Sequence, residues 1–302
     1  MEPPMYQTII LADDGGVIHR YPDFASQFVA ARHVDVWLPP NYAPTNDARF
    51  PVIYMHDGKN LFDPTIANTG VDWGVDEAVT RLTQAGVIAG AIVVGVWHSD
   101  TRWRDYMPQK PVEQAAAALL APFIAQNGGP PQSDAYLRFL VTEVKPFIDA
   151  AYRTRPGQPH TFIMGSSMGG LVSLYALSEY PRIFGGAGCL STHWPAGGAA
   201  LVTQMAAAVP APGQHRLYFD YGTEGLDANY EPFQQQMDAR LRRMGYQFGE
   251  DWLTRKFSGA DHSETAWRAR VEIPLRFLLS GDWTNFTRSM AIFTRANWSN
   301  LA

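Results

Sequence analysis

The sequence Gly-Ser-Ser-Met-Gly at 165–169 constrains the fold of this chain more than any other feature. An apolar run at 161–164 precedes it and a second apolar run at 170–177 follows it. The first run predicts a β-strand and the second predicts a helix, so the five residues form a tight strand-to-helix turn. At such a turn the flanking positions have no room for bulky side chains, and the middle residue takes a strained backbone conformation. The pattern therefore predicts an exposed serine hydroxyl at the start of a helix.

Two serines compete for that position, and their spacing from the glycines separates them. Ser167 stands between Gly165 and Gly169, as the pattern Gly-x-Ser-x-Gly requires. Ser166 would need glycines where the chain has Met164 and Met168. We therefore interpret Ser167 as the candidate nucleophile.

The composition is that of a globular protein rather than a nucleic-acid or membrane-binding one. The chain has 302 residues, of which 46% are hydrophobic and 18% charged, and its net charge is −5. No run of lysine and arginine is present, which argues against nucleic-acid and membrane-surface partners. The single cysteine, Cys189, lies in an apolar run and is expected to be an inert core residue. The N-terminal residues lack the pattern of a signal peptide and no apolar run is long enough for a bilayer, so we expect a cytoplasmic protein.

Apolar runs and helical patterns alternate along the chain. The predicted strands are Gln7–Leu11, Phe28–Leu38, Pro51–Met55, Ala91–Val96, Thr161–Met164, Leu217–Tyr221 and Trp252–Phe257. The predicted helices are Asp76–Ala85, Asp134–Tyr152, Tyr230–Met244 and Ser263–Leu279. Pro146 and Pro274 should kink or break the second and the fourth of them. Most of the strands are apolar without alternation, which indicates a parallel sheet covered on both faces.

This alternation predicts a single doubly wound α/β domain over residues 1–302, with a mostly parallel central sheet and helices on both faces. Residues 108–133 depart from the alternation, with an alanine-rich half followed by Asn-Gly-Gly-Pro-Pro. This segment is either a lid over the ligand edge of the sheet or an exposed insertion.

A serine hydroxyl needs a base, and hydrolases of the α/β class place the partners in the chain order Ser, acid, His. His215 precedes a predicted strand and so falls at the edge opposite the serine. His262 follows the last predicted strand, in the loop at 259–264, which is the edge where ligands bind in such sheets. His262 is therefore the candidate base.

The acid should lie in the loop at 221–231, after the strand that begins at Leu217. Asp227 is the first choice and Glu224 the alternative, while Glu231 stays open. Asp220 is expected inside the strand. Residue order alone does not separate these carboxylates.

The backbone N–H of Met168, just after the serine, is one expected donor to an oxyanion. The second should come from the loop at 56–62, where Gly58 lets the chain turn and Lys59 presents its backbone N–H. His56 and Asp57 precede the serine in the chain, and we interpret them as shaping this loop.

Aromatic and basic residues near the predicted strand ends are candidates for binding the substrate. The first choices are Trp73, Arg102, Tyr106 and Trp194, and His193 is expected beside the site. Further candidates of the same kind are Trp97, Trp103, Arg104 and Tyr230. Aromatic faces would suit an aryl or sugar-bearing ester, and an arginine would suit a carboxylate or phenolate. The same residue types are also common in protein cores and in structural ion pairs.

Several stretches together resemble one family of α/β-hydrolases. They are residues 54–63, Trp73, 93–96, 102–108, 165–170 and 259–268, so the resemblance spans about residues 50 to 280. The family contains esterase D, enterochelin esterases, bacterial feruloyl esterases and mycobacterial mycolyltransferases. The resemblance implies a Ser-His-acid triad, ester hydrolysis and no cofactor.

The predicted function is a serine carboxylic-ester hydrolase that works through an acyl-enzyme and acts on a small-molecule ester, either aryl (feruloyl-like) or acetyl and sugar esters. No spacing typical of a metal site or a phosphate-binding loop is present, so we expect no cofactor and no metal. Two alternatives remain: an acyltransferase with the same triad, and a non-catalytic binding protein on a hydrolase fold. The sequence leaves the oligomeric state open.

Overall fold

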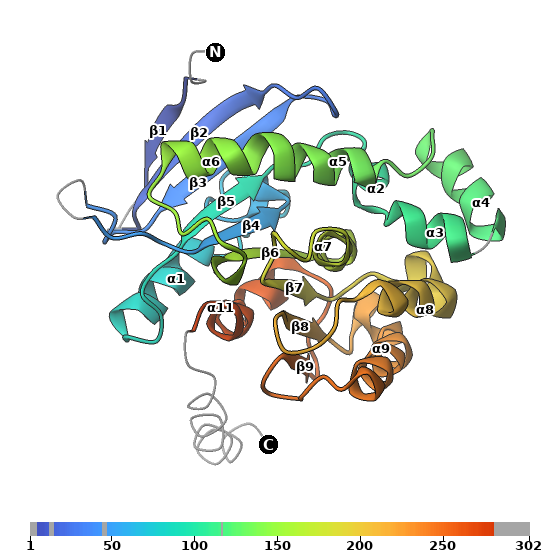
Figure 1. The fold of residues 1–302 in the computed structure, drawn as a ribbon. Coiled ribbons are helices and arrows are strands. Elements are labelled where there is room, and N and C mark those ends of the chain that lie inside the picture. Colours follow the sequence, from blue (N-terminus) through green and yellow to red (C-terminus); the bar gives the residue numbers. More distant parts are fainter. Residues whose placement is uncertain (1–4, 12–14, 44–46, 116, 281–302) are drawn as a thin grey trace.

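A nine-stranded β-sheet runs through the molecule in the order β1-β2-β3-β5-β4-β6-β7-β8-β9 (Figure 1). The structure is a computed structural model and describes residues 5–11, 15–43, 47–115 and 117–280. The strands are β1 (Gln7–Ile10), β2 (Val17–Phe24), β3 (Arg32–Leu38), β4 (Val52–His56), β5 (Ile92–Val96), β6 (Thr161–Ser166), β7 (Gly186–Leu190), β8 (Arg216–Tyr221) and β9 (Trp252–Lys256). The pairs from β5 to β9 are parallel, and only the pairs that involve β1, β2 and β3 are antiparallel. This mostly parallel sheet confirms the predicted fold class.

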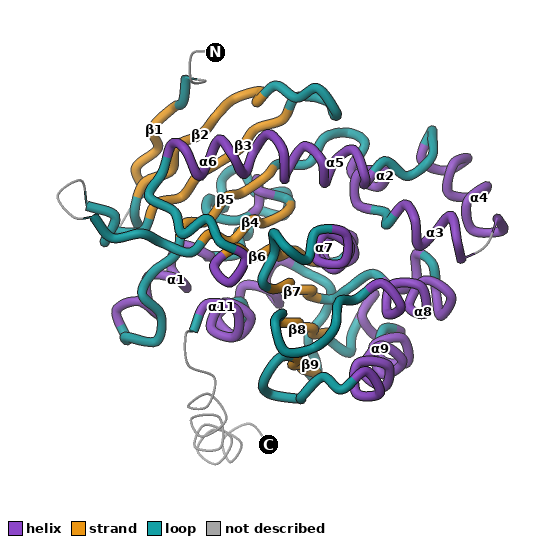
Figure 2. The backbone as a smooth tube through the Cα atoms, viewed as in Figure 1, coloured by secondary structure: helices purple, strands orange, loops and turns teal. Residues whose placement is uncertain are grey.

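Helices cover both faces of the sheet, as Figure 2 shows. The longer ones are α1 (Val75–Gln84), α4 (Ala117–Asn127), α7 (Met168–Glu179), α8 (Gly198–Ala208), α9 (Glu231–Met244) and α11 (Glu272–Leu279). The shorter ones are α2 (Arg102–Tyr106), α3 (Gln109–Ala115), α5 (Ser133–Phe139), α6 (Lys145–Ala151) and α10 (Glu264–Arg268). One core cluster joins the sheet to α5, α7, α8 and α9, and the other joins it to α1 and α11.

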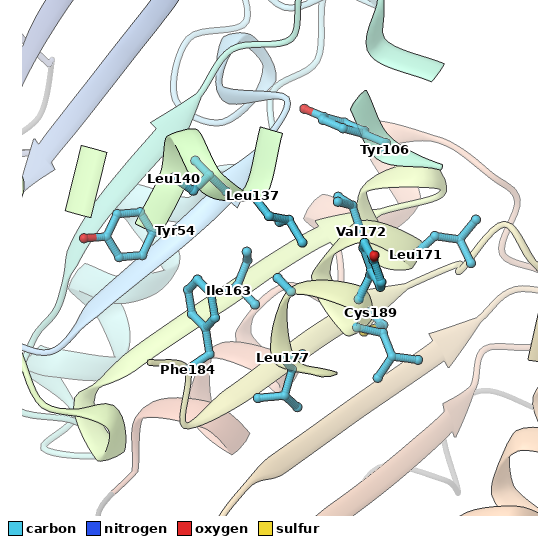
Figure 3. Close-up of a cluster of buried hydrophobic side chains, with 14 of the residues drawn as sticks. Tyr54, Tyr106, Leu137, Leu140, Ile163, Leu171, Val172, Leu177, Phe184 and Cys189 are labelled. Atoms are coloured by element: carbon cyan, nitrogen blue, oxygen red, sulfur yellow. The ribbon is translucent and has the colours of Figure 1, made fainter. Parts of the chain in front are cut away.

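The alternation of side chains along β4 explains how one strand serves both layers. Val52 and Tyr54 belong to the first core cluster, whereas Ile53 and Met55 belong to the second. Successive residues of a strand point to opposite faces, so an unbroken apolar run is what a doubly covered strand needs. Figure 3 shows the first cluster, in which Tyr54 and side chains of α5 and α7 pack over the sheet.

Two strands were not predicted, and one prediction began too early. The predicted strand at 28–38 begins only at Arg32, and β2 lies before it as its antiparallel partner. β7, with the sequence Gly-Ala-Gly-Cys-Leu, is short and rich in glycine, so its pattern is weak. Gly186 is nonetheless required, because a Cβ there would lie 2.7 Å from the backbone carbonyl oxygen of Arg216 on β8. Cys189 in this strand is fully buried, as expected for a core residue.

Prolines divide the two long predicted helices. The helix predicted at 134–152 forms α5 and α6 with a π-helical turn, Leu140–Val144, between them, just before Pro146. A wider turn accommodates a residue that has no N–H and whose ring crowds the preceding turn. The helix predicted at 263–279 is α10 and α11, with Pro274 in the first turn of the second.

In the excursion at 108–133, the described residues form helices α3 and α4, beside α2 and α8 in Figure 1. Its C-terminal end is bound to α2, because Arg104 Nε donates to the Pro130 carbonyl at 2.9 Å and the Gln132 N–H donates to the Arg104 carbonyl at 2.8 Å.

Candidate active site

Four neighbouring strands, β4, β6, β7 and β8, are parallel and therefore end at the same edge of the sheet. The residues that directly follow the first three are Asp57, Ser167 and Ser191, and Asp227 lies in the loop after the fourth. The four residues with positive φ other than glycine, among those the structure describes, are Asp57, Ser167, Ser191 and Asp23. Such conformations are strained and concentrate at functional sites, so three of the four mark this edge.

Ser167 has the backbone geometry that its sequence context predicts. Its φ is 56° and its ψ is −122°, and it directly precedes α7. The turn is closed by a hydrogen bond from the Ser167 N–H to the Leu190 carbonyl, at 2.9 Å. Gly165 is required here, because a Cβ would lie 2.9 Å from the Gly169 carbonyl carbon. The backbone alone therefore holds this serine at the start of a helix.

The loop after β8 brings Asp227 to His262. The His262 imidazole donates through Nδ1 to Asp227 Oδ1 at 2.5 Å, because an ionised carboxylate can only accept. Asp227 is 1% exposed, whereas the alternative acid, Glu224, is exposed at the start of the same loop. Glu231 lies elsewhere and pairs with Lys256 at 2.7 Å. The geometry thus favours Asp227 among the three carboxylates left open by the sequence.

The second oxygen of Asp227 is also fully engaged. Oδ2 accepts from the Ser191 hydroxyl at 2.6 Å and from the Gly222 N–H at 2.7 Å. Burial by itself raises the pKa of Asp227, but the hydrogen bonds from His262, Ser191 and Gly222 outweigh it and hold the pKa below its usual value. Asp227 is therefore an anion at neutral pH.

His262 is oriented by aromatic rings as well as by Asp227. The Trp267 ring meets it edge to face, with centroids 5.0 Å apart, and Trp73 packs behind Trp267 at 5.4 Å. Within the described residues, neither the Ser167 hydroxyl nor His262 Nε2 makes a hydrogen bond, and both residues are partly exposed. In enzymes without substrate such bonds are often long and tighten only when substrate binds.

His193 connects the serine and the histidine. Its N–H donates to the Ser167 carbonyl at 3.1 Å, and its ring lies 6.5 Å from that of His262. Its Nδ1 bonds the Tyr230 hydroxyl at 2.5 Å. Burial, with smaller contributions from His262 and Arg102, lowers the pKa of His193 to about 4, so its ring is neutral at neutral pH. Trp103, 43% exposed, meets this ring edge to face at 5.7 Å.

The loop predicted to complete an oxyanion site is held by an ion pair. Asp57 has φ 56° and accepts from Arg102 Nε and Nη2, both at 2.7 Å. Burial raises the pKa of Asp57, but Arg102 reverses the effect and lowers it overall. Lys59 follows in a short 3₁₀-helix, and Met168 is the first residue of α7, positions where backbone N–H groups lack intrahelical acceptors. His56 bonds Tyr136 through Nδ1 at 2.8 Å, and burial lowers its pKa to about 3, so it too is neutral.

Three of the four residues predicted to bind substrate lie in the interior, which corrects that prediction. Trp73 is 3% exposed, Tyr106 is 0% and Trp194 is 1%, and Trp194 bonds Gln234. Arg102 keeps an exposed portion of 24%, but two of its nitrogens bind Asp57. The exposed ring at this edge is Trp103, which follows Arg102 in the chain. Its place near a predicted strand end made it one of several aromatic candidates, and the sequence did not single it out.

Within the described residues, no cluster of histidine, cysteine and carboxylate side chains is arranged to hold a metal ion. In the same part of the chain, no helix has both the length and the apolar character that crossing a bilayer requires.

The profile of a family described as "Putative esterase" matches residues 26–278. The chain belongs to this esterase family. The match includes Ser167, Asp227 and His262, and confirms the predicted resemblance. Solved structures of similar fold are esterases and serine hydrolases, and the chain is a carboxylic ester hydrolase.

Two relatives of this esterase are the uncharacterized Bacillus subtilis (strain 168) proteins YbbA and YjcH. YbbA is 25% identical over 193 residues, which are 64% of this chain and 68% of YbbA. YjcH is 27% identical over 178 residues, which are 58% of this chain and 61% of YjcH.

Solved structures share the α/β-hydrolase fold of the esterase. The IroE-like serine hydrolase from Shewanella oneidensis has a TM-score of 0.65 at 18% identity, over 90% of this chain and 79% of its own. Enterobactin esterase FES from Shigella flexneri, in the presence of enterobactin, has a TM-score of 0.61 at 19% identity, over 90% and 58%. A ferulic acid esterase has a TM-score of 0.60 at 17% identity, over 87% and 97%.

Proposed function

We propose that this esterase cleaves its substrate through an acyl-enzyme formed on Ser167, with His262 as base and Asp227 as acid. The observation that carries the proposal is the 2.5 Å bond from His262 to buried, ionised Asp227, at the same sheet edge as a serine with φ 56°. The His262–Asp227 pair and Ser167 come from separate loops. A pair with only a structural role would not need a strained serine at the same edge.

In the first step His262 Nε2 takes the Ser167 proton while Oγ attacks the ester carbonyl carbon. Asp227 keeps the Nδ1 proton in place and stabilises the imidazolium. The oxygen that becomes negative receives hydrogen bonds from the N–H groups of Met168 and Lys59, each worth about 3 kcal/mol in the barrier. His262 then protonates the leaving alcohol, and water repeats the sequence on the acyl-enzyme.

For the substrate we propose an ester with an aryl or a sugar group. Trp103 presents an exposed ring at the site, and the partly buried ring of His193 lies between it and His262. Flat rings favour stacking on flat or partly apolar groups. Enterobactin and ferulic acid appear in the names of proteins with this fold, which is consistent with aryl acids. We propose further that α3 and α4 act as a lid, since the end of their segment is bound to the helix that carries Trp103.

The test compares Ser167→Ala with Ser166→Ala, because the two serines are adjacent and only one follows the strand end. Hydrolysis of p-nitrophenyl acetate and methyl ferulate is measured for both variants and the parent. We expect Ser167→Ala to lose at least about 10⁴-fold in kcat and Ser166→Ala to stay within a few-fold. A burst of p-nitrophenol in the parent, absent from Ser167→Ala, would identify the acyl-enzyme. Equal activity of Ser167→Ala and the parent would exclude this mechanism.

A further inference from the structure

We propose that Ser191 is a positioning residue of the reaction: its hydroxyl holds the Asp227 carboxylate in the orientation that engages His262. The inference rests on the proposed triad, and it concerns a residue that follows β7, on a different strand from either partner.

The direction of each hydrogen bond at Ser191 follows from its neighbours. Trp267 Nε1 and Arg270 Nη2 lie 3.0 and 2.9 Å from Ser191 Oγ, and both groups can only donate. They occupy the two acceptor positions of the hydroxyl. Its single proton must therefore be donated to Asp227 Oδ2, 2.6 Å away. Every hydrogen-bonding position of this hydroxyl is used, so its orientation is determined.

This arrangement determines the rotation of the Asp227 carboxylate. Ser191 and the Gly222 N–H both bind Oδ2, which leaves Oδ1 to receive the His262 N–H. The ring of Trp267 at the same time packs against His262, so one side chain contacts both the positioning hydroxyl and the base.

Because Arg270 is charged, the Ser191 hydroxyl has an electrostatic effect as well as a packing role. The guanidinium is 3% exposed, and its Nη2 also binds Asp220 Oδ1 at 3.0 Å. Ser191 Oγ thus lies between a buried cation and the Asp227 anion. Without the hydroxyl, attraction between Arg270 and Oδ2 would favour turning the carboxylate away from His262.

The backbone of Ser191 supports the same conclusion. Its φ of 39° lies in the left-handed region, where glycine is unstrained and a serine is not. A glycine would therefore suit the chain path better, and what it would remove is the hydroxyl. The strain is offset by the three hydrogen bonds that the side chain makes.

Ser191→Gly removes the hydroxyl while leaving a residue that tolerates the backbone conformation. Asp23→Gly is the matched control. Asp23 also has a positive φ, of 47°, but its side chain is 80% exposed. With p-nitrophenyl acetate we expect Ser191→Gly to lose about 10- to 100-fold in kcat with KM within about twofold, at an unchanged or higher melting temperature. Asp23→Gly should change neither constant. An unchanged kcat in Ser191→Gly, or a loss that appears in KM alone, would overturn the inference.

A double-mutant cycle with Asp227→Asn shows whether Ser191 acts through Asp227. If it does, the double variant should be no slower than Asp227→Asn alone, whereas independent losses that multiply would overturn the inference. Should Ser191→Gly fail to fold, Ser191→Ala enters the same cycle. Full activity in Asp227→Asn would refute the triad itself, while an inactive Asp227→Asn beside a fully active Ser191→Gly would refute only the role of Ser191.

Discussion

The nucleophile side of the candidate site and its acid–base side are built by different means. On the first side, Ser167 and the N–H of Met168 are placed by one turn between β6 and α7, through backbone conformation and the absence of a side chain at Gly165. On the second side, Asp227, His262 and Ser191 come from three loops and are joined by side-chain hydrogen bonds of 2.5 and 2.6 Å.

The difference teaches which forces each side depends on. The turn is enforced by steric exclusion, which is insensitive to charge and to pH. The acid–base side depends on which groups are ionised and on exact pairing in a buried environment, where an unpaired partner is costly. Substitutions should therefore affect the nucleophile side through added volume and the acid–base side through removed charge.

The largest expected effect concerns the charge on the acid–base side. Asp227→Asn keeps the volume but removes the anion that orients His262 and stabilises the imidazolium, and we expect kcat to fall by about 10³- to 10⁴-fold. Glu224→Gln, in the same loop but exposed, should leave kcat within about twofold. Steady-state kinetics on p-nitrophenyl acetate provide both values. The reverse ranking would assign the acid to Glu224.

The next effect concerns volume on the nucleophile side. In Gly165→Ala the new Cβ would lie 2.9 Å from the backbone of Gly169, which cannot move without opening the turn. We therefore expect the free energy of unfolding to fall by about 2 kcal/mol or more. In Gly169→Ala the nearest atom, His56 Cβ, is 3.4 Å away, and the loss should stay below about 1 kcal/mol. Urea unfolding of the two variants measures the difference. Equal losses would show that the turn is not sterically closed.

A smaller effect concerns pH and His193, which connects the two sides. Its pKa falls from the usual 6.5 to about 4 in the folded state, so between these values the unfolded chain binds more protons. Stability is therefore lost as the pH falls through that window. His193→Phe should reduce this loss by about 2 kcal/mol between pH 7 and pH 5. Urea unfolding at both pH values is the measurement, and an identical loss in the variant would mean that His193 is protonated in the folded protein.

The smallest expected effect concerns the exposed ring of Trp103, which belongs to neither side of the site. Trp103→Ala should raise KM for methyl ferulate by about 3- to 10-fold and leave hydrolysis of p-nitrophenyl acetate almost unchanged, because only the aryl ester offers a ring to stack. Phe248→Ala removes another exposed ring, 58% exposed and packed on Trp252 of β9, and should change neither. If both esters lose activity equally in Trp103→Ala, the ring supports the fold rather than the substrate.

Local patterns predicted most of the fold. Apolar runs located β4, β5, β6 and β8 to within two residues at each end, and the strand predicted at 252–257 is β9, at one edge of the sheet. β7 was not predicted, because a glycine-rich strand has a weak hydrophobic pattern. The need for glycine there comes from contacts with neighbouring strands, which the local sequence does not show. The two long helices were predicted as regions, and their interruptions lie close to prolines.

Sequence order led to Ser167 and His262, and their assignment as nucleophile and base stays a prediction. It did not separate Asp227 from Glu224, which are three positions apart in one loop and differ chiefly in burial. Ser191 carried no signal at all, because its partners Asp227, Trp267 and Arg270 are 36, 76 and 79 residues away. The burial of Trp73, Tyr106 and Trp194 could not be predicted for a similar reason. Aromatic residues occur both in protein cores and at binding surfaces, and their local sequence does not distinguish the two.

The sequence by itself determined the α/β class, the esterase family and the turn that exposes Ser167, because these depend on periodicity and on steric rules between residues close in the chain. Only the tertiary structure decided which carboxylate meets His262, which hydroxyl holds that carboxylate and which aromatic ring reaches solvent. Those outcomes depend on burial and on hydrogen bonds between distant segments, and such contacts exist only after the sheet has brought the ends of β6, β7 and β8 together.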